Sequence, residues 1–153
     1  MDHTHPPRIQ EATMKMVDSR TGLESISREE CLRLLAGDEI GRLAVIDGRT
    51  PVILPVTYAM DGEAVVFRTG PGVKLDAGPR SPASFEVDAI DRERHTGWSV
   101  VVTGRLREVT DYEGETLERL RRLDVSPWAG GARDHWMRLE PTRITGRRIG
   151  SRR

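Results

Sequence analysis

The chain has 153 residues, the usual size of a single domain. Its 24 basic and 24 acidic residues leave no net charge, so the electrostatic attraction that drives binding to nucleic acid or to an anionic membrane is missing. The longest apolar runs, such as 52–54 and 100–102, are too short to cross a bilayer. The first residues lack the apolar core of a secretion signal, and the single cysteine, Cys31, can form no internal disulfide. We therefore expect a soluble cytoplasmic protein that binds neither nucleic acid nor membrane.

Residues 1–24 show no sustained periodicity and contain two histidines and two prolines near their start. We expect them to form a flexible N-terminal arm, and residues 25–150 to form the folded domain. The pair His3-x-His5 has the chemistry of a metal ligand, but the sequence offers no second ligand cluster. No metal site is therefore predicted.

The ordered part is expected to begin with a short helix. Ser27 is followed three positions later by Glu30, the pattern of a capping box in which each residue satisfies a backbone amide of the other. Leucines follow, and Gly37 is placed to end the helix in a left-handed cap.

Strands follow from residue 40 onward. Apolar runs at 40–46, 51–60 and 63–69 are separated by Asp47-Gly48 and Asp61-Gly62, which are signals for tight hairpin turns. The three runs therefore predict an antiparallel meander. A proline at position 55 cannot donate a hydrogen bond to the ladder, so it indicates an edge, a bulge or a split in the sheet.

The second half of the chain continues the same pattern. We predict strands at 84–88 and 98–109, with a bulge at Gly104, then a helix at 113–123 and one or two closing strands within 138–149. About six strands and two short helices indicate a mainly β protein, a closed or nearly closed antiparallel barrel.

The stretch R-T-G-P-G-V-K at 68–74 leaves a predicted strand and holds one of only two lysines in the chain. The Gly-Pro-Gly turn at 70–72 can expose backbone amides to an anion. Arg68, Thr69 and Lys74 add two positive charges and a hydroxyl, which suit a phosphate. An ordinary hairpin with a solvated lysine explains the same residues, and the local pattern alone leaves both interpretations open.

The order of these segments resembles that of the pyridoxamine 5′-phosphate oxidase-like family of flavin-binding split barrels, in particular its nitroimidazole-reductase-like branch. The resemblance extends from about residue 27 to residue 149. The segments that carry it are 30–35, 40–44, 51–58, 66–69, 72–75, 84–88 and 98–105.

The resemblance implies a six-stranded antiparallel split barrel of the FMN-binding type, which pairs with a second copy and holds FMN in a groove at the homodimer interface. It implies that the backbone of Pro55, Val56 and Thr57 passes along the flavin ring, while Arg68, Thr69 and Lys74 bind the phosphate. It also implies that Trp98 and Ser99 approach the cofactor near the interface.

The expected function is that of an FMN-dependent oxidoreductase acting on a small organic substrate. The cofactor supplies the chemistry in such proteins, so no catalytic side chain is predicted. Neither His95 nor His135 has a sequence partner at nucleophile or metal spacing. The loop at 126–136 either closes over a substrate or joins two elements.

Three alternatives remain open: a deazaflavin-dependent reductase, a carrier or sensor that binds flavin or haem without turnover, and an interaction module with an empty groove. The pyridoxamine phosphate oxidase reaction itself is not expected. The arginine-rich C-terminal stretch lacks the aspartate of the substrate motif found in that enzyme.

Overall fold

The computed structural model describes residues 18, 20–70, 81–127 and 135–150. These residues form seven strands, two α-helices and one 3-10 turn. In chain order they are β1 (Leu23–Ile26), α1 (Arg28–Ala36), β2 (Ile40–Asp47), β3 (Thr50–Asp61), β4 (Ala64–Thr69), β5 (Ser81–Asp91), β6 (Thr96–Val109), η1 (Asp111–Glu113), α2 (Gly114–Arg121) and β7 (His135–Ile149).

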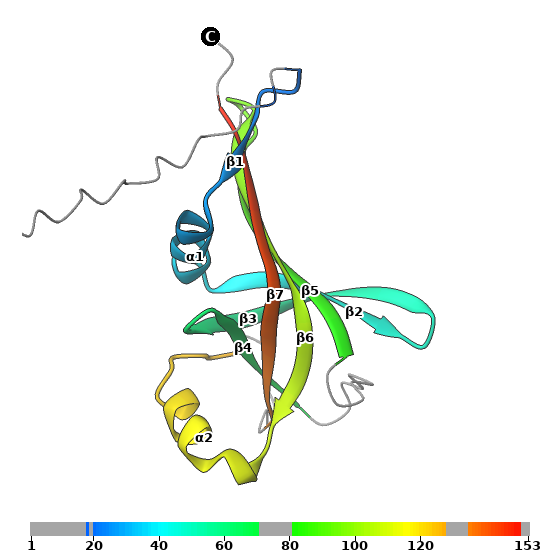
Figure 1. The fold of residues 1–153 in the computed structure, drawn as a ribbon, viewed down its shortest axis with the longest axis vertical. Helices are drawn as coiled ribbons and strands as arrows, with labels where there is room; N and C mark the ends of the chain where they lie inside the picture. The colour runs from blue at the N-terminus through cyan, green and yellow to red at the C-terminus, as the bar shows by residue number, and fades with distance from the viewer. Residues whose placement is uncertain (1–17, 19, 71–80, 128–134, 151–153) are drawn as a thin grey trace, which may run out of the picture.

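The long strand β7 closes the sheet into a barrel. One of its edges pairs with β6, and its other edge pairs first with β4 and then, near its end, with β1. The strand order β7-β4-β3-β2-β5-β6 then returns to β7, and every pairing is antiparallel (Figure 1). The six-stranded barrel expected from the sequence is therefore confirmed, with β1 as an additional short strand.

Two details differ from the sequence expectations. The strand β1 includes Leu23 and Glu24, which the sequence analysis placed in the N-terminal arm. The side chain of Ser27 does cap α1 by accepting from the amide of Glu30 at 3.2 Å. Gly37 ends the helix with φ −90°, so its cap is not left-handed.

The two hairpin turns agree with the sequence pattern, because Gly48 and Gly62 both have φ +61°.

The barrel is split where β3 changes partners. Residues 50–57 of β3 pair with β2, whereas residues 58–61 pair with β4. At the transition the amide of Tyr58 donates to the carbonyl oxygen of Glu39 at 2.9 Å. Pro55 lies in the part of β3 that has β2 as its only strand neighbour among the described residues. This position suits proline, because proline has no amide hydrogen to donate to a second neighbouring strand.

The main core fills the barrel interior. Phe67, Phe85 and Leu139 are almost fully buried there, and α1 closes one end with Leu35. Tyr58 joins these parts, because its hydroxyl donates to the carbonyl oxygen of Leu35 and its ring meets Phe85 edge to face at 4.7 Å. Burial raises the pKa of this hydroxyl.

A second, smaller core lies on the outside of the barrel, where α2 covers β4, β6 and β7 (Figure 1). Its buried members are Val66, Val109, Leu117, Leu120, Val125 and Trp136. The predicted helix therefore buries its leucines as expected, and it does so against the outer face of the sheet.

A chain of alternating charges borders this second core. It runs from Arg119 through Asp61, Arg138, Glu140 and Arg107 to Glu113. Asp61 accepts two hydrogen bonds of 2.8 Å from Arg119 and a further one from Arg138. These guanidinium groups lower the pKa of Asp61 from 3.8 to about 2. The chain of charges thus connects α2 to the β3–β4 turn.

Asp61→Asn is expected to lower the free energy of unfolding at pH 7 by about 2 kcal/mol. The folded-state pKa is depressed, so the stabilisation is fully present above about pH 4 and is lost as the pH falls towards about pH 2. Urea unfolding followed by tryptophan fluorescence across this range measures the effect. Asp47→Asn, at an exposed hairpin position, is the control and should behave as the wild type. An unchanged acid dependence in Asp61→Asn would contradict the role of the ion pairs.

Candidate functional site

The split creates two strand edges without a partner among the described strands. One is the β4-facing edge of β3 over residues 50–57, and the other is the β3-facing edge of β4 at residues 68–69. Unpaired backbone amides and carbonyls along such edges need a hydrogen-bonding partner. This geometry suits a flat polar ligand that inserts between the strands.

Pro55, Val56 and Thr57, which the family resemblance places along the flavin ring, lie on the first of these edges. Pro55 is exposed on the outer face, while Val56 is half-buried and packs against the main core. Thr57 is half-buried and pairs with Ile40 at the point where β3 leaves β2. The structure therefore places all three residues beside the split.

Arg68 and Thr69 lie at the end of β4, and their side chains point to opposite faces. Arg68 pairs with Trp136 in the sheet and its guanidinium carbon lies 5.7 Å from the centre of that indole ring. Thr69 is only 8% exposed and pairs with His135. A phosphate that contacts both residues would have to lie across the end of the strand. Lys74 lies outside the described residues.

A histidine–carboxylate pair at the same end of the barrel was missed by the sequence analysis. His135 Nδ1 lies 2.6 Å from Glu108 Oε1. The two residues are 27 positions apart, and only the pairing of β6 with β7 brings them together. No spacing rule could have found this pair.

Trp98 and Ser99 lie towards the opposite end of the barrel. They pair with Arg148 and Arg147 on β7, whereas Arg68 pairs with Trp136. From Trp136 to Arg148 is twelve positions, on the order of 40 Å of extended strand. Trp98 packs against the main core. These two residues therefore lie far along the barrel from Arg68 and Thr69, which lie at the end where the phosphate is expected.

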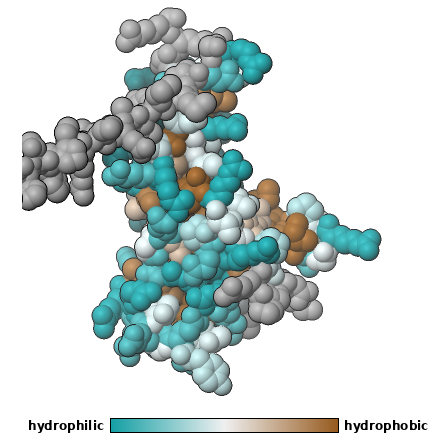
Figure 2. All heavy atoms as spheres, in the orientation of Figure 1, coloured by the Kyte–Doolittle hydropathy of each residue, from teal (hydrophilic) through white to brown (hydrophobic). Residues whose placement is uncertain are grey.

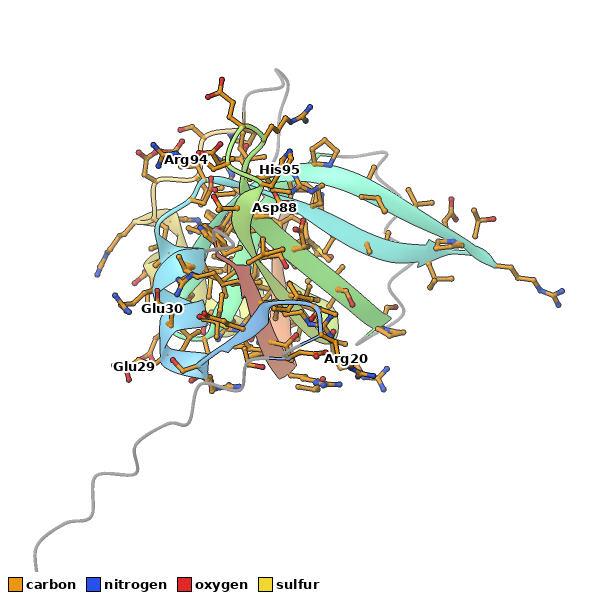
Figure 3. The ribbon with its side chains drawn as sticks, turned by 90° about the horizontal axis from the view of Figure 1, so that it is seen from above. Arg20, Glu29, Glu30, Asp88, Arg94 and His95 are labelled. Atoms are coloured by element: carbon orange, nitrogen blue, oxygen red, sulfur yellow. The ribbon has the colours of Figure 1, made fainter. Side chains whose placement is uncertain are left out.

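The outer face near the split carries exposed apolar side chains. The β2–β3 hairpin projects away from the barrel (Figure 3), and its surface is largely apolar (Figure 2). Ile46 is 51% and Ile53 is 67% exposed. Apolar residues gathered on a projecting arm are typical of a surface that a protein partner covers.

A charged cluster adjoins this apolar surface. Arg42 on β2 lies 2.9 Å from Glu86 and 2.7 Å from Asp88, both on β5. Burial, together with the neighbouring Asp88 carboxylate, raises the pKa of Glu86. The cluster has one cation for two carboxylates, which leaves the site an excess of negative charge when both are ionised.

Two properties of the described residues concern metal binding and membrane crossing. They contain no group of three or more histidine, cysteine, aspartate or glutamate residues that could hold a metal ion. Within the same residues, neither helix has the length and apolar character needed to cross a membrane.

The closed sheet with one open seam defines a split barrel, the fold expected from the sequence. The chain belongs to the pyridoxamine 5′-phosphate oxidase family, because the model of that family matches residues 27–148. It is 38% identical over 130 residues to Rv0080, an uncharacterised protein of Mycobacterium tuberculosis, with 81% of this chain and 84% of the relative covered.

Solved structures agree with this assignment. The FAD binding protein from Mycobacterium smegmatis is 36% identical, with a TM-score of 0.68 and coverage of 82% of this chain and 96% of that chain. A FAD-binding protein from Mesorhizobium loti is 28% identical, with a TM-score of 0.66 and coverage of 84% and 99%.

Proposed function

We propose that the chain binds a flavin nucleotide at the split and is an oxidoreductase that acts on a small organic substrate. The observation that carries this proposal is the partner change of β3, which leaves two strand edges open to a flat polar ring. The FAD-binding proteins named above support the same class of ligand.

The residues beside the split fit the parts of a flavin nucleotide. The backbone of 55–57 would meet the polar edge of the ring, because this stretch has free groups on its β4-facing edge. Arg68 and Lys74 would neutralise the phosphate and Thr69 would donate a hydroxyl to it. A bound flavin supplies hydride or electron transfer, so the chain needs no acid or base side chain of its own for that step.

FMN is our first candidate for the cofactor. The ring, ribityl chain and first phosphate are shared by FMN and FAD, so the residues named here serve either nucleotide. The adenylate half of FAD would need further contacts. Identification of the released molecule decides between the two, and it also tests the deazaflavin alternative.

We also propose that the functional unit is a homodimer. Trp98 and Ser99 on β6 lie far from Arg68 and Thr69 of their own chain, and in the proposed dimer they would approach the cofactor near the interface. The exposed Ile46 and Ile53 on the projecting hairpin provide an apolar surface for that copy.

The direct experiment is an absorption spectrum of the purified protein, followed by heat release and mass identification of the chromophore. Released FMN or FAD supports the proposal, and reduction by a nicotinamide donor followed by transfer to an acceptor supports the enzymatic part. A colourless protein that refuses added FMN, FAD and deazaflavin would contradict it.

Lys74→Ala is expected to weaken flavin affinity on the order of tenfold, because the phosphate loses a charged partner. Quenching of flavin fluorescence in a titration measures the effect. Lys15→Ala removes the only other lysine of the chain and is the matched control. Equal affinities of the two variants would remove Lys74 from the phosphate site.

Ile53→Asp is expected to weaken dimerisation on the order of a hundredfold, because a charge would be placed in an apolar interface. Light scattering over a range of concentrations measures the oligomeric state. Tyr112→Asp changes another exposed apolar residue, located on η1, and should leave the dimer intact. A monomeric wild-type protein would contradict the proposal.

A further inference from the structure

The β6–β7 ladder contains a bulge that reshapes the outside of the barrel. Thr103 pairs with Arg143 and Gly104 pairs with Pro141, so Thr142 has no partner opposite. A side chain at Gly104 would place its Cβ 1.9 Å from the carbonyl oxygen of Glu140, so the close approach of the two strands requires glycine. The bulge therefore depends on the glycine at position 104.

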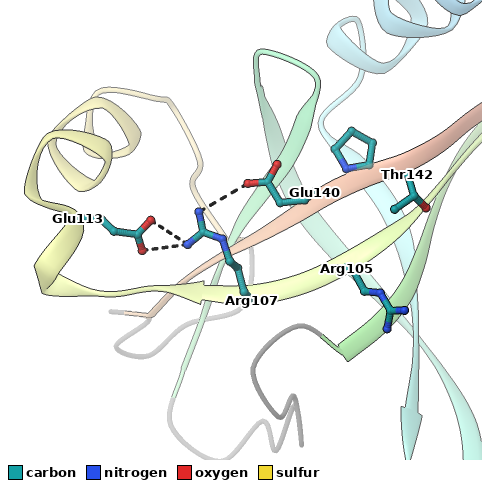
Figure 4. A pocket seen from close by; sticks show the side chains of 6 residues that line it. Arg105, Arg107, Glu113, Glu140 and Thr142 are labelled. Carbon is teal, nitrogen blue, oxygen red and sulfur yellow. Dashed lines mark hydrogen bonds and ion pairs between the residues drawn. The ribbon is translucent and has the colours of Figure 1, made fainter.

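Beside the bulge lies an open cavity of about 540 Å³ (Figure 4). Its volume falls in the range of small-molecule sites. It lies against β6, β7 and η1, whereas the split lies between β3 and β4, so the two sites are separate. The cavity is lined by Arg105, Arg107, Glu113, Glu140, Pro141 and Thr142.

The carboxylates that line this cavity already have cationic partners. Glu113 accepts two hydrogen bonds of 2.9 Å from Arg107, whose guanidinium also lies 3.5 Å from Glu140. Glu140 accepts a further hydrogen bond from Arg138. Both acidic groups are thus neutralised from within the protein.

Arg105 is the cation left over. It stands directly opposite Glu140 in the ladder, yet it forms no ion pair with any residue that the structure describes. Figure 4 shows its guanidinium directed away from Glu140, while Arg107 is directed towards it. The cavity therefore presents one uncompensated guanidinium, a planar donor group that matches the geometry of a carboxylate or phosphate.

The hydroxyl group of Thr142 sets a second condition on the polar groups of a ligand in this cavity. Its hydroxyl donates to the carbonyl oxygen of Thr103 at 3.0 Å, so the proton of the hydroxyl is already used. Towards a ligand the Thr142 oxygen can act only as an acceptor. A ligand hydroxyl group satisfies this requirement, and the ring of Pro141 offers an apolar surface beside it.

We propose that this cavity binds a small hydroxylated anion, a hydroxy acid or a sugar phosphate. Its carboxylate or phosphate lies on Arg105, its hydroxyl donates to Thr142, and its carbon skeleton contacts Pro141. The site is independent of the flavin proposed above, since none of its residues lies at the split.

Calorimetric titrations with malate and with glycerol 3-phosphate test the proposal, using protein that is saturated with FMN or FAD if it binds one. Succinate and inorganic phosphate are the matched probes that lack the hydroxyl. We expect saturable binding of malate, glycerol 3-phosphate or both, and weaker binding of the probe without the hydroxyl. The stronger ligand identifies the anionic group.

Arg105→Gln is expected to weaken binding on the order of tenfold or more, because a charge-assisted hydrogen bond is lost. Arg92→Gln removes an exposed arginine of the β5–β6 turn and should leave affinity unchanged. Thr142→Val should remove the preference for malate over succinate. Absence of saturable binding of both anions, equal weakening in Arg92→Gln, or displacement of bound flavin by the anion would overturn the proposal.

Discussion

The backbone hydrogen bonding of β3 is the constraint on which the candidate site depends. A strand has two edges, and β3 uses one for β2 over its first eight residues and the other for β4 over its last four. The switch at Tyr58 is held in place by burial, since this side chain lies between α1 and Phe85 in the main core. The open seam is therefore a consequence of core packing, and its position follows from where Tyr58 has to lie.

The outside of the barrel is organised by charge balance. The helix α2 covers β4, β6 and β7 and buries one apolar patch between them. Around this patch, arginine side chains form ion pairs with carboxylates, and some carboxylates are shared by two arginines. Asp61, Glu113 and Glu140 are shared among Arg107, Arg119 and Arg138. Each of these carboxylates therefore already has at least one arginine partner. Arg105 on the same face forms no ion pair with any carboxylate among the described residues.

Much of the fold could be predicted because its signals are local. The Asp-Gly turns, the serine cap of α1, the proline at 55 and the glycine at 104 each act within a few residues. These signals predicted the meander and the bulge, and the proline indicated an edge, a bulge or a split, of which the family resemblance favoured the split. The short strand β1 was missed, because its four residues form a strand only through pairing with β7, at least 120 positions away.

The site was less predictable for the same physical reason. Residues 55–57 were proposed from the family resemblance and residues 68–69 from the glycine-rich turn that follows them, and the structure places both stretches beside the split. The pairing of His135 with Glu108 depends on the closure of β6 with β7, which no local pattern encodes. The same closure places Arg105 where it has no ion-pair partner in the described part of the chain. Strand alternation also separates the side chains of Arg68 and Thr69, although they are neighbours in sequence.

The position of β7 in the barrel has a consequence for how the protein is made. It is the last of the described strands in chain order, yet β1, β4 and β6 all pair with it. A nascent chain that has not yet reached residue 135 therefore leaves one edge each of β1, β4 and β6 without its strand partner. Its long-range pairings predict slow folding, and edges that remain open during synthesis are the surfaces by which nascent chains aggregate. Completion of the barrel therefore waits for β7, and until β7 has paired, the partly formed sheet exposes edges that can bind other chains.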